Sequence, residues 1–278
     1  MADKITVFEA QKWAFLLADQ NNLEHSAIDL LLCGQMGWNL TQLLTHYQDE
    51  FDQKSWELFQ ANVAKYLKGM PPQYILGYAA FFGRKFKVNE YTLIPRVETQ
   101  DLVEWILQDG VCGRVLDLGT GSGAIGVTLK KENPKCEVLL SDISAPALAV
   151  AKGNAQALEA DVSFCVSDVF NGIAGKFDVV VSNPPYIALD EAEYMDQSVL
   201  DYEPELALFA EDEGLAIYKK ICREIKGHLN PNARLYLEIG FLQGQKLVSL
   251  FKKAYPKAQV TLKQDESGRD RMVRVIFN

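Results

Sequence analysis

The chain has 278 residues, of which 48% are hydrophobic and 23% charged, an ordinary globular composition. Its length suffices for one large α/β domain and a smaller companion. A net charge of −9 and a pI of about 5.0 disfavour a protein that binds nucleic acid directly, because such proteins normally present a basic face. Residues 1–4 lack a basic flank followed by an apolar core, so we expect no signal peptide, and no apolar run reaches the ~18 residues of a membrane span. We expect a cytoplasmic monomer with no membrane partner.

The cysteines are scattered and form no C-x-x-C pair. Such a pattern favours reduced residues that pack among apolar neighbours over a disulfide framework or a metal site. We therefore expect no bound metal. The five cysteines are Cys33, Cys112, Cys136, Cys165 and Cys222.

Residues 5 to about 70 are predicted to be helical. Apolar residues recur there at three- and four-residue spacing, as in Trp56, Phe59 and Val63, and the segment ends at residues 69–72, which contain Gly and two Pro. We predict a small helical bundle over residues 1–72. It either supports the main domain or contacts a macromolecular substrate, and the pattern alone leaves both roles open.

Residues 73–98 are predicted to form a β-hairpin linker. Two β-rich runs, residues 81–88 and 91–95, flank Asn89 and Glu90, where we place the turn.

From residue 99 to 278 short apolar strands alternate with helical stretches, which predicts a parallel, doubly wound sheet. The last two strands have no helix between them and form a hairpin, so the final strand is antiparallel. A parallel sheet with one antiparallel C-terminal strand is the Rossmann-like arrangement of class I methyltransferases. The expected strands are residues 114–118, 137–141, 162–166, 179–182, 235–239, 259–263 and 272–277.

A glycine-rich loop follows the first of these strands, and glycines there permit a tight turn and close approach of a ligand. The loop has no Lys where a nucleoside triphosphate site needs one, and its G-x-G-x-G spacing differs from the dinucleotide pattern. The loop consists of Gly119, Thr120, Gly121, Ser122 and Gly123.

Acidic residues around this loop favour a cationic ligand such as S-adenosylmethionine over a dinucleotide with its pyrophosphate. Asp142 ends the second strand, where a carboxylate can accept both ribose hydroxyls. Asp117, just before the loop, is expected to meet a cationic group of the ligand. Asp168, with Val169 beside it, is expected near the adenine amine, or else as a simple helix N-cap.

The tetrapeptide Asn183-Pro184-Pro185-Tyr186 directly follows the fourth strand, and we expect it to face the cofactor loop across the same crevice. The Asn183 oxygen and the Pro184 carbonyl can accept the two N–H groups of a planar amide or amine. Proline offers no competing donor, and Tyr186 can stack on the planar group. No histidine lies near these motifs, so we predict no histidine base.

Together these residues resemble the HemK/PrmC family, the N5-glutamine methyltransferases of peptide-chain release factors. The similarity covers nearly the whole chain, although Val97 and Gln100 depart from the usual family pattern. Further matching segments are residues 72–77, 81–83, 93–96, 98–99, 202–204 with 207–208, and 268–271.

The resemblance implies that the N-terminal domain helps to engage a class 1 release factor. It also implies transfer of a methyl group from S-adenosylmethionine to the glutamine of that factor's Gly-Gly-Gln loop, with S-adenosylhomocysteine as product. By position, the glycine loop, Asp142, Asp168 and Val169 would hold the cofactor, while residues 183–186 hold the glutamine. Asn183 would border both ligands, and Phe81 and Arg96 would line the glutamine's approach.

Three alternatives remain open at the level of sequence. A glutamine methyltransferase of a ribosomal protein would share every core residue. Adenine-N6 methylation of nucleic acid is disfavoured by the acidic balance and by the lack of a target-recognition domain. A non-catalytic adaptor would not need the intact tetrapeptide.

Overall fold

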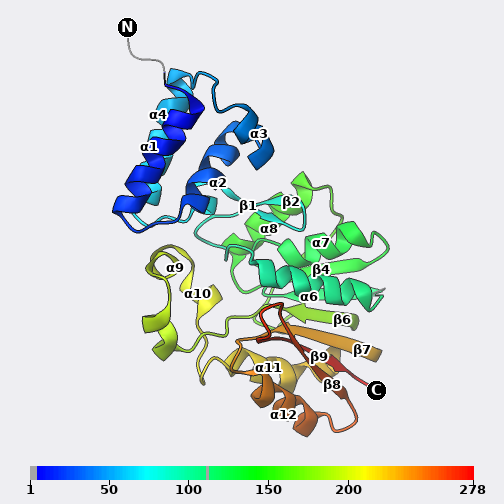
Figure 1. Cartoon of the computed structure of the whole chain (residues 1–278). Coiled ribbons are helices and arrows are strands. Elements are labelled where there is room, and N and C mark those ends of the chain that lie inside the picture. The colour runs from blue at the N-terminus through cyan, green and yellow to red at the C-terminus, as the bar shows by residue number, and fades with distance from the viewer. Residues whose placement is uncertain (1–4, 111–112) are drawn as a thin grey trace. The chain divides into compact units, whose positions relative to one another are not determined.

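The computed structural model describes residues 5–110 and 113–278, so the expectations for residues 1–4 and for Cys112 lie outside the described residues. The chain divides into two compact units (Figure 1). One comprises the chain up to Tyr78 together with Asp196–Tyr202, and the other comprises Ala79–Met195 with Glu203–Asn278.

The first unit is helical, which confirms the helices expected between residues 5 and 70. Side chains close the helix starts: Thr6 and Glu9 form a capping box on the first helix, and Asn39 and Gln42 do so on the third. The helices bury one apolar core that includes Leu31, Phe59 and Val63. The elements of this unit are α1 (Val7–Gln20), α2 (His25–Met36), α3 (Leu40–Thr45), α4 (Gln53–Tyr66), α5 (Pro72–Leu76) and α9 (Gln197–Tyr202).

A two-stranded hairpin follows α5, with strands β1 (Tyr78–Phe81) and β2 (Arg84–Lys87). Its turn is at Phe82 and Gly83, so the expected turn at Asn89 and Glu90 was wrong. Both turn residues have positive φ, +50° and +72°, as a two-residue type I′ hairpin turn requires. Asn89 instead begins a separate turn, in which its carbonyl accepts the N–H of Thr92 at 3.0 Å.

The second unit is built on a seven-stranded sheet in the order β5-β4-β3-β6-β7-β9-β8. Strand β9 pairs antiparallel with both β7 and β8, while the other neighbouring strands pair in parallel. Strand β9 alone therefore runs against the rest, as the sequence predicted. The strands are β3 (Arg114–Leu118), β4 (Glu137–Asp142), β5 (Ser163–Val166), β6 (Phe177–Ser182), β7 (Leu229–Glu238), β8 (Gln259–Gln264) and β9 (Asp270–Ile276).

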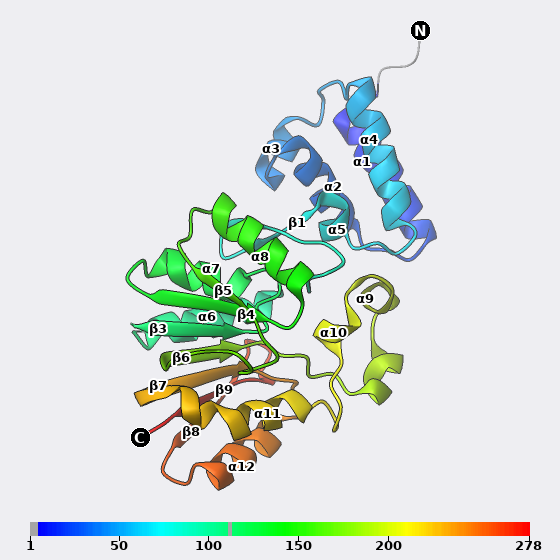
Figure 2. The ribbon, with the colours of Figure 1, turned by 180° about the vertical axis from the view of Figure 1, so that it is seen from behind.

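Helices pack on both faces of this sheet, because its strands carry apolar side chains on alternate sides. Val115 of β3 joins one buried cluster and Leu116 the other. Figure 2 shows the side of the sheet that carries α11 and α12. One face is covered by α6 (Val97–Gln108), α7 (Ala124–Glu132) and α8 (Ala145–Ala157), the other by α11 (Ala216–Glu224) and α12 (Gly244–Ala254). Shorter helices are η1 (Leu189–Tyr194), α10 (Glu205–Leu208) and η2 (Ile225–His228).

The sheet order reverses at β3, because the chain proceeds outward from β3 to β4 and β5 and then returns to place β6 on the other side of β3. Ligands of open α/β sheets bind at the carboxyl ends of the strands at such a reversal. The fold therefore places the glycine loop after β3 beside the tetrapeptide after β6.

Cysteine burial agrees with a packing role for these residues. Cys33, Cys136 and Cys222 are buried, and Cys165 is half-buried. Burial also raises the pKa of the Cys33 and Cys222 thiols. Across residues 5–110 and 113–278, the structure contains no helix with the length and hydrophobicity needed to cross a membrane.

Candidate active site

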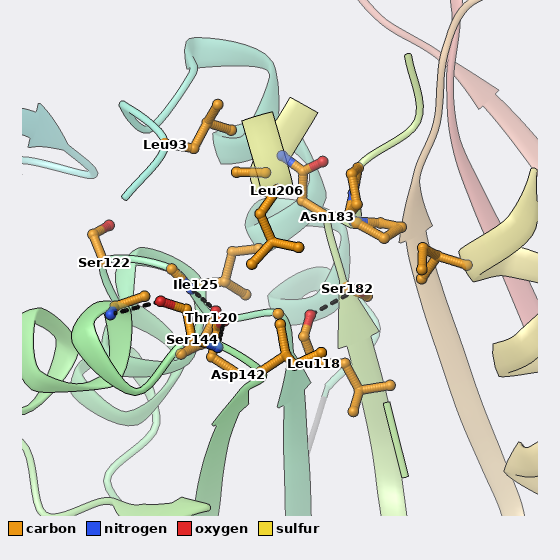
Figure 3. A pocket seen from close by; sticks show the side chains of 18 of the residues that line it. Leu93, Leu118, Thr120, Ser122, Ile125, Asp142, Ser144, Ser182, Asn183 and Leu206 are labelled. Carbon is orange, nitrogen blue, oxygen red and sulfur yellow. Dashed lines mark hydrogen bonds between the residues drawn. The ribbon is translucent and has the colours of Figure 1, made fainter. Parts of the chain in front are cut away.

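A cavity of about 390 Å³ opens at the carboxyl ends of the central strands. Figure 3 shows its labelled side chains gathered at the ends of the strands, with Asp142 from β4 and Asn183 from the segment after β6. The Ser182 hydroxyl donates to the Leu118 carbonyl at 2.7 Å and so ties the ends of β6 and β3 together. The volume lies in the range of small-molecule sites.

The glycine loop forms one wall of the cavity. Gly119, Thr120, Gly121 and Ser122 line it, whereas Gly123 lies outside and precedes α7. Gly119 and Gly121 have positive φ, and a Cβ atom on either would meet no atom within 4 Å. The loop therefore leaves open space where side chains would otherwise stand.

Asp117 anchors this loop from below and does not line the cavity. Its Oδ2 accepts the Thr120 hydroxyl at 2.6 Å and the Gly126 N–H at 2.9 Å. Its Oδ1 is buried and has no hydrogen-bond partner among the described residues. Burial raises the pKa of the Asp117 carboxyl to about 7, against the opposing effect of these two hydrogen bonds. A contact between Asp117 and a cationic ligand group stays a prediction.

Asp142 ends β4 at the cavity wall. Its Oδ2 accepts the Gly121 N–H and its Oδ1 the Ser144 N–H, both at 2.9 Å. Burial nevertheless raises the pKa of this carboxyl above its ordinary value. These two bonds leave further lone pairs on both oxygens, which can accept hydroxyl groups of a ligand.

Asp168 and Val169 also line the cavity, after β5. The Asp168 carboxylate lies 2.6 Å from Lys220 Nζ on α11. Val169 has φ +55°, a strained conformation for a β-branched residue. The Ser167 hydroxyl lies 2.8 Å from the Val169 carbonyl and 2.7 Å from that of Asn171, which holds this turn in place. The structure therefore holds this cavity-lining residue in a conformation that it would not adopt by preference.

Of the tetrapeptide, Asn183, Pro184 and Pro185 line the cavity and Tyr186 does not. The Tyr186 ring packs against the apolar cluster under α11 and α12, and burial raises its phenol pKa to about 12. Its backbone carbonyl accepts the Gln243 side-chain N–H at 2.8 Å. The position of the ring gives no support to the expected stacking on a substrate.

Of the two residues expected to line the approach of the substrate, only Arg96 lines the cavity. Phe81 is 1% exposed and packs edge-on against Phe86 in the core, because its strand turns that side inward, and it does not line the cavity. Arg96 lines the cavity and its guanidinium donates to Glu203 at 2.6 Å. Glu203 also accepts the Ile94 N–H at 3.1 Å, and so fixes the segment before α6.

Sequence reasoning missed a polar chain behind Asn183. The Asn183 Nδ2 donates to the Thr99 hydroxyl at 3.3 Å, and that hydroxyl donates to Glu238 at 2.7 Å. Glu238 is buried, and burial raises its pKa to about 7. Thr99 was noted only as part of a matching segment, and no spacing rule connects residues so far apart in the chain.

The strand order, with β9 alone reversed, defines a class I methyltransferase fold, and solved structures share it. A methyltransferase from Pyrococcus furiosus aligns with a TM-score of 0.53 at 20% identity, over 78% of this chain and 96% of that chain. The hMettl16 catalytic domain, solved in complex with the MAT2A 3′UTR hairpin 6, aligns with a TM-score of 0.57 at 15% identity, over 82% and 83%. At these identities the likeness concerns the fold alone.

Comparison of sequences identifies a more specific group of relatives than comparison of folds. Residues 98–200 match the methyltransferase small domain family and residues 9–77 the PrmC N-terminal domain family. The release factor glutamine methyltransferase of Enterococcus faecalis is 42% identical over 95% of this chain and 97% of that protein. That of Bacillus cereus is 38% identical over 96% and 98%. The chain belongs to the family of release factor glutamine methyltransferases, which confirms the resemblance to HemK/PrmC proteins.

Proposed function

We propose that this chain transfers a methyl group from S-adenosylmethionine to the side-chain amide nitrogen (N5) of a glutamine. The acceptor is the glutamine of the Gly-Gly-Gln loop in a class 1 peptide-chain release factor, and S-adenosylhomocysteine is the product. One observation carries the proposal. The open glycine loop lines the same cavity as Asn183 and Pro184, two residues whose oxygens can accept hydrogen bonds, in a chain whose relatives are named for this reaction.

The residues at the ends of β3 and β4 suit S-adenosylmethionine. Gly119 and Gly121 leave open space at the loop, and Asp142 presents carboxylate oxygens that can accept two ribose hydroxyls. Asp168 and Val169 line the part of the cavity where we place the adenine. Acidic groups on this wall suit the positive charge of the sulfonium and ammonium groups, and no metal is required.

The wall opposite suits an amide. Amide nitrogen is a poor nucleophile because its lone pair is delocalised into the carbonyl, and positive charge develops on it during methylation. The Asn183 Oδ1 and the Pro184 carbonyl can accept its two N–H groups and stabilise that charge. When bound, S-adenosylmethionine supplies a methyl group that is already activated, so orientation of the amide provides much of the remaining rate. Because the Tyr186 ring lies outside the cavity, we assign the positioning to Asn183, Pro184 and Pro185.

The proposal extends to the partner. In it, residues 1–72 help to engage the release factor, residues 73–98 link them to the rest of the chain, and residues 99–278 carry out the transfer. The match of residues 9–77 to the PrmC N-terminal domain family supports a separate N-terminal domain. The enzyme would act as a monomer in the cytoplasm, where release factors work.

The test is transfer of a labelled methyl group from S-adenosylmethionine to purified release factor, beside a variant of that factor with alanine for the loop glutamine. We expect label on the native factor alone. Equal labelling of both would exclude the loop glutamine as acceptor. No label on either, with cofactor binding shown by calorimetry, would exclude the release factor, and ribosomal proteins and then nucleic acids would be tested as acceptors.

A further inference from the structure

A buried carboxylate lies behind the amide that faces the cavity. Glu238 ends β7 and is 1% exposed. Its Oε2 accepts a hydrogen bond from the Thr99 hydroxyl at 2.7 Å, and Thr99 Oγ1 accepts one from Asn183 Nδ2 at 3.3 Å. Thr99 and Asn183 line the cavity, whereas Glu238 does not. This hydrogen-bonded chain therefore runs from the interior of the unit to the cavity wall.

The polarity of this chain decides which end of the Asn183 amide faces a ligand. An ionised carboxylate can only accept hydrogen bonds, so the Thr99 hydroxyl uses its one hydrogen to donate a hydrogen bond to Glu238. The Thr99 oxygen is then left with lone pairs, which pair with the N–H of an amide and not with its oxygen. The Asn183 Oδ1, at the other end of the amide, stays available for donors in the cavity.

We propose that Glu238 and Thr99 are positioning residues, which hold the Asn183 amide so that its oxygen accepts an N–H of the substrate glutamine. This inference rests on the proposed methyl transfer, because a glutamine amide brings two N–H donors that need acceptors. In a reversed Asn183 amide, the Nδ2 group would face an N–H of the substrate. Two hydrogen-bond donors would then oppose each other, and both would lack an acceptor in a partly buried site. The pair thus acts on the reaction through Asn183.

Glu238 stands among groups from several elements. Burial is the largest influence on it and raises its pKa to about 7. The Thr99 hydrogen bond and the positive charges of Arg271 and Arg96 oppose that rise, while Glu98 adds to it. Two phenols also face it: Tyr186, after β6, and Tyr218 of α11, whose hydroxyl donates to the Glu238 backbone carbonyl at 2.7 Å.

Protonation of Glu238 removes the constraint. A protonated carboxyl can donate to Thr99, whose own proton is then free to turn toward Asn183, where it favours the reversed amide. The active arrangement therefore requires ionised Glu238. We expect kcat to rise as the pH rises through about 7 and to level off above it.

The kinetic test compares three threonine variants. Thr99→Val keeps the shape but removes the hydroxyl, and we expect kcat to fall at least about 10-fold while cofactor affinity stays nearly native. Thr99→Ser restores the hydroxyl and should recover most of the activity. Thr128→Val is the matched control, because Thr128 is also buried, in α7, and its hydroxyl has no partner among the described residues. Native kcat in folded Thr99→Val would overturn the inference.

The pH profile provides the second readout. In Glu238→Gln the group no longer titrates, so the rise in kcat near pH 7 should disappear, whatever the level of the remaining activity. The same rise in Glu238→Gln as in the native enzyme would show that another group causes it and would contradict the role given to Glu238.

A spectroscopic readout keeps this inference separate from the identity of the substrate. In protein labelled with ¹⁵N at asparagine, the Asn183 side-chain amide is assigned with Asn183→Asp. We expect its signals to shift with pH near 7 in the native protein and in Thr128→Val, but not in Glu238→Gln or Thr99→Val. A native protein without that shift would overturn the inference. If the shift occurs but no release factor is methylated, the positioning chain stands and the proposed acceptor fails.

Discussion

Behind each of two walls of the cavity, a buried carboxyl group accepts a hydrogen bond from a threonine hydroxyl, but the two pairs hold different groups in place. Under the glycine loop, Asp117 accepts the Thr120 hydroxyl at 2.6 Å, and behind the tetrapeptide Glu238 accepts the Thr99 hydroxyl at 2.7 Å. Both carboxyls are fully buried, and burial raises the pKa of each to about 7. Asp117 also accepts the Gly126 backbone N–H beside the loop, whereas Glu238 is connected through Thr99 to the side chain of Asn183.

The difference teaches what each ligand demands. In the proposed reaction, a cofactor bound by backbone and carboxylate groups needs a rigid loop, which Asp117 provides through its hydrogen bonds to Thr120 and Gly126. An amide that must be aligned for transfer needs acceptors with a fixed direction, which the second carboxylate provides through Thr99. Changes on the Asn183 wall should therefore lower turnover, and changes on the glycine-loop wall should lower cofactor affinity or stability.

The largest effect is expected on the Asn183 wall. Asn183→Ala removes the acceptor oxygen, and we expect kcat for methyl transfer to fall at least about 100-fold, because loss of one preorganised contact commonly costs about 3 kcal/mol in the transition state. Thermal unfolding and cofactor affinity, measured by calorimetry, should stay close to native. Turnover at the native rate in the folded variant would break the comparison between the two walls.

On the opposite wall, Asp142→Ala should weaken S-adenosylmethionine binding by about 10- to 100-fold, since it removes a charged acceptor at the cavity. Calorimetric titration measures this, with Asp161→Ala, at an exposed position, as the control. Asp142 also binds the Gly121 N–H, so Asp142→Asn, which keeps an acceptor oxygen, should lose less affinity. Native affinity in Asp142→Ala would refute its place in the cofactor site.

We expect the titration of Asp117 to make the free energy of unfolding depend on pH. Its folded-state pKa of about 7 lies above the ordinary 3.8, so the folded protein keeps a proton that the unfolded chain loses. The free energy of unfolding therefore falls as pH rises from about 4 to about 7, and then levels off. Asp117→Asn lacks this contribution. The free energy of unfolding of Asp117→Asn, minus that of the native protein, should therefore increase by roughly 3 kcal/mol between pH 5 and pH 8. Urea unfolding at both pH values measures this difference.

An advantage for Asp117→Asn that stayed constant across this pH range would show that Asp117 is ionised in the folded protein at both values. At pH 5 the two buried carboxyls would then differ in charge state, as well as in the groups that they hold.

The smallest effect concerns a third buried threonine. The Thr128 hydroxyl has no hydrogen-bond partner among the described residues, so Thr128→Val should stabilise the protein by about 1 kcal/mol. Valine has the same branched shape and fits the same helix. Denaturant unfolding measures this, and a destabilised Thr128→Val would mean that the hydroxyl is satisfied in solution.

Much of the glycine-loop wall could be predicted from the sequence because its contacts are local. Asp117 contacts Thr120 and Gly126 three and nine residues away, and the glycines mark the loop directly. The apolar runs likewise predicted β3 and most of β4, and the helix-free end of the chain predicted the reversed strand.

The other wall could not be predicted in full because its contacts are remote in sequence. Thr99 lies 84 residues from Asn183 and 139 from Glu238, and only the fold brings α6, β6 and β7 together. The packing of Tyr186 against the core is equally a tertiary effect. The hairpin turn was misplaced for a local reason. The residues Asn89-Glu90 are typical of a turn, whereas Phe82 adopts a positive φ that the sequence does not predict for a phenylalanine.

The insertion of β9 between β7 and β8 has a consequence for synthesis of the protein. A chain that emerges from the ribosome presents β7, which ends at Glu238, well before Asp270–Ile276, whereas β8 ends at Gln264, shortly before it. Until then each has an open edge where β9 will pair, and such edges recruit other strands. The buried Met272, Val273 and Val275 are missing from the core over the same interval. This part of the sheet is therefore completed only once β9 has been synthesised, and the edges of β7 and β8 stay open to pairing with other strands until then.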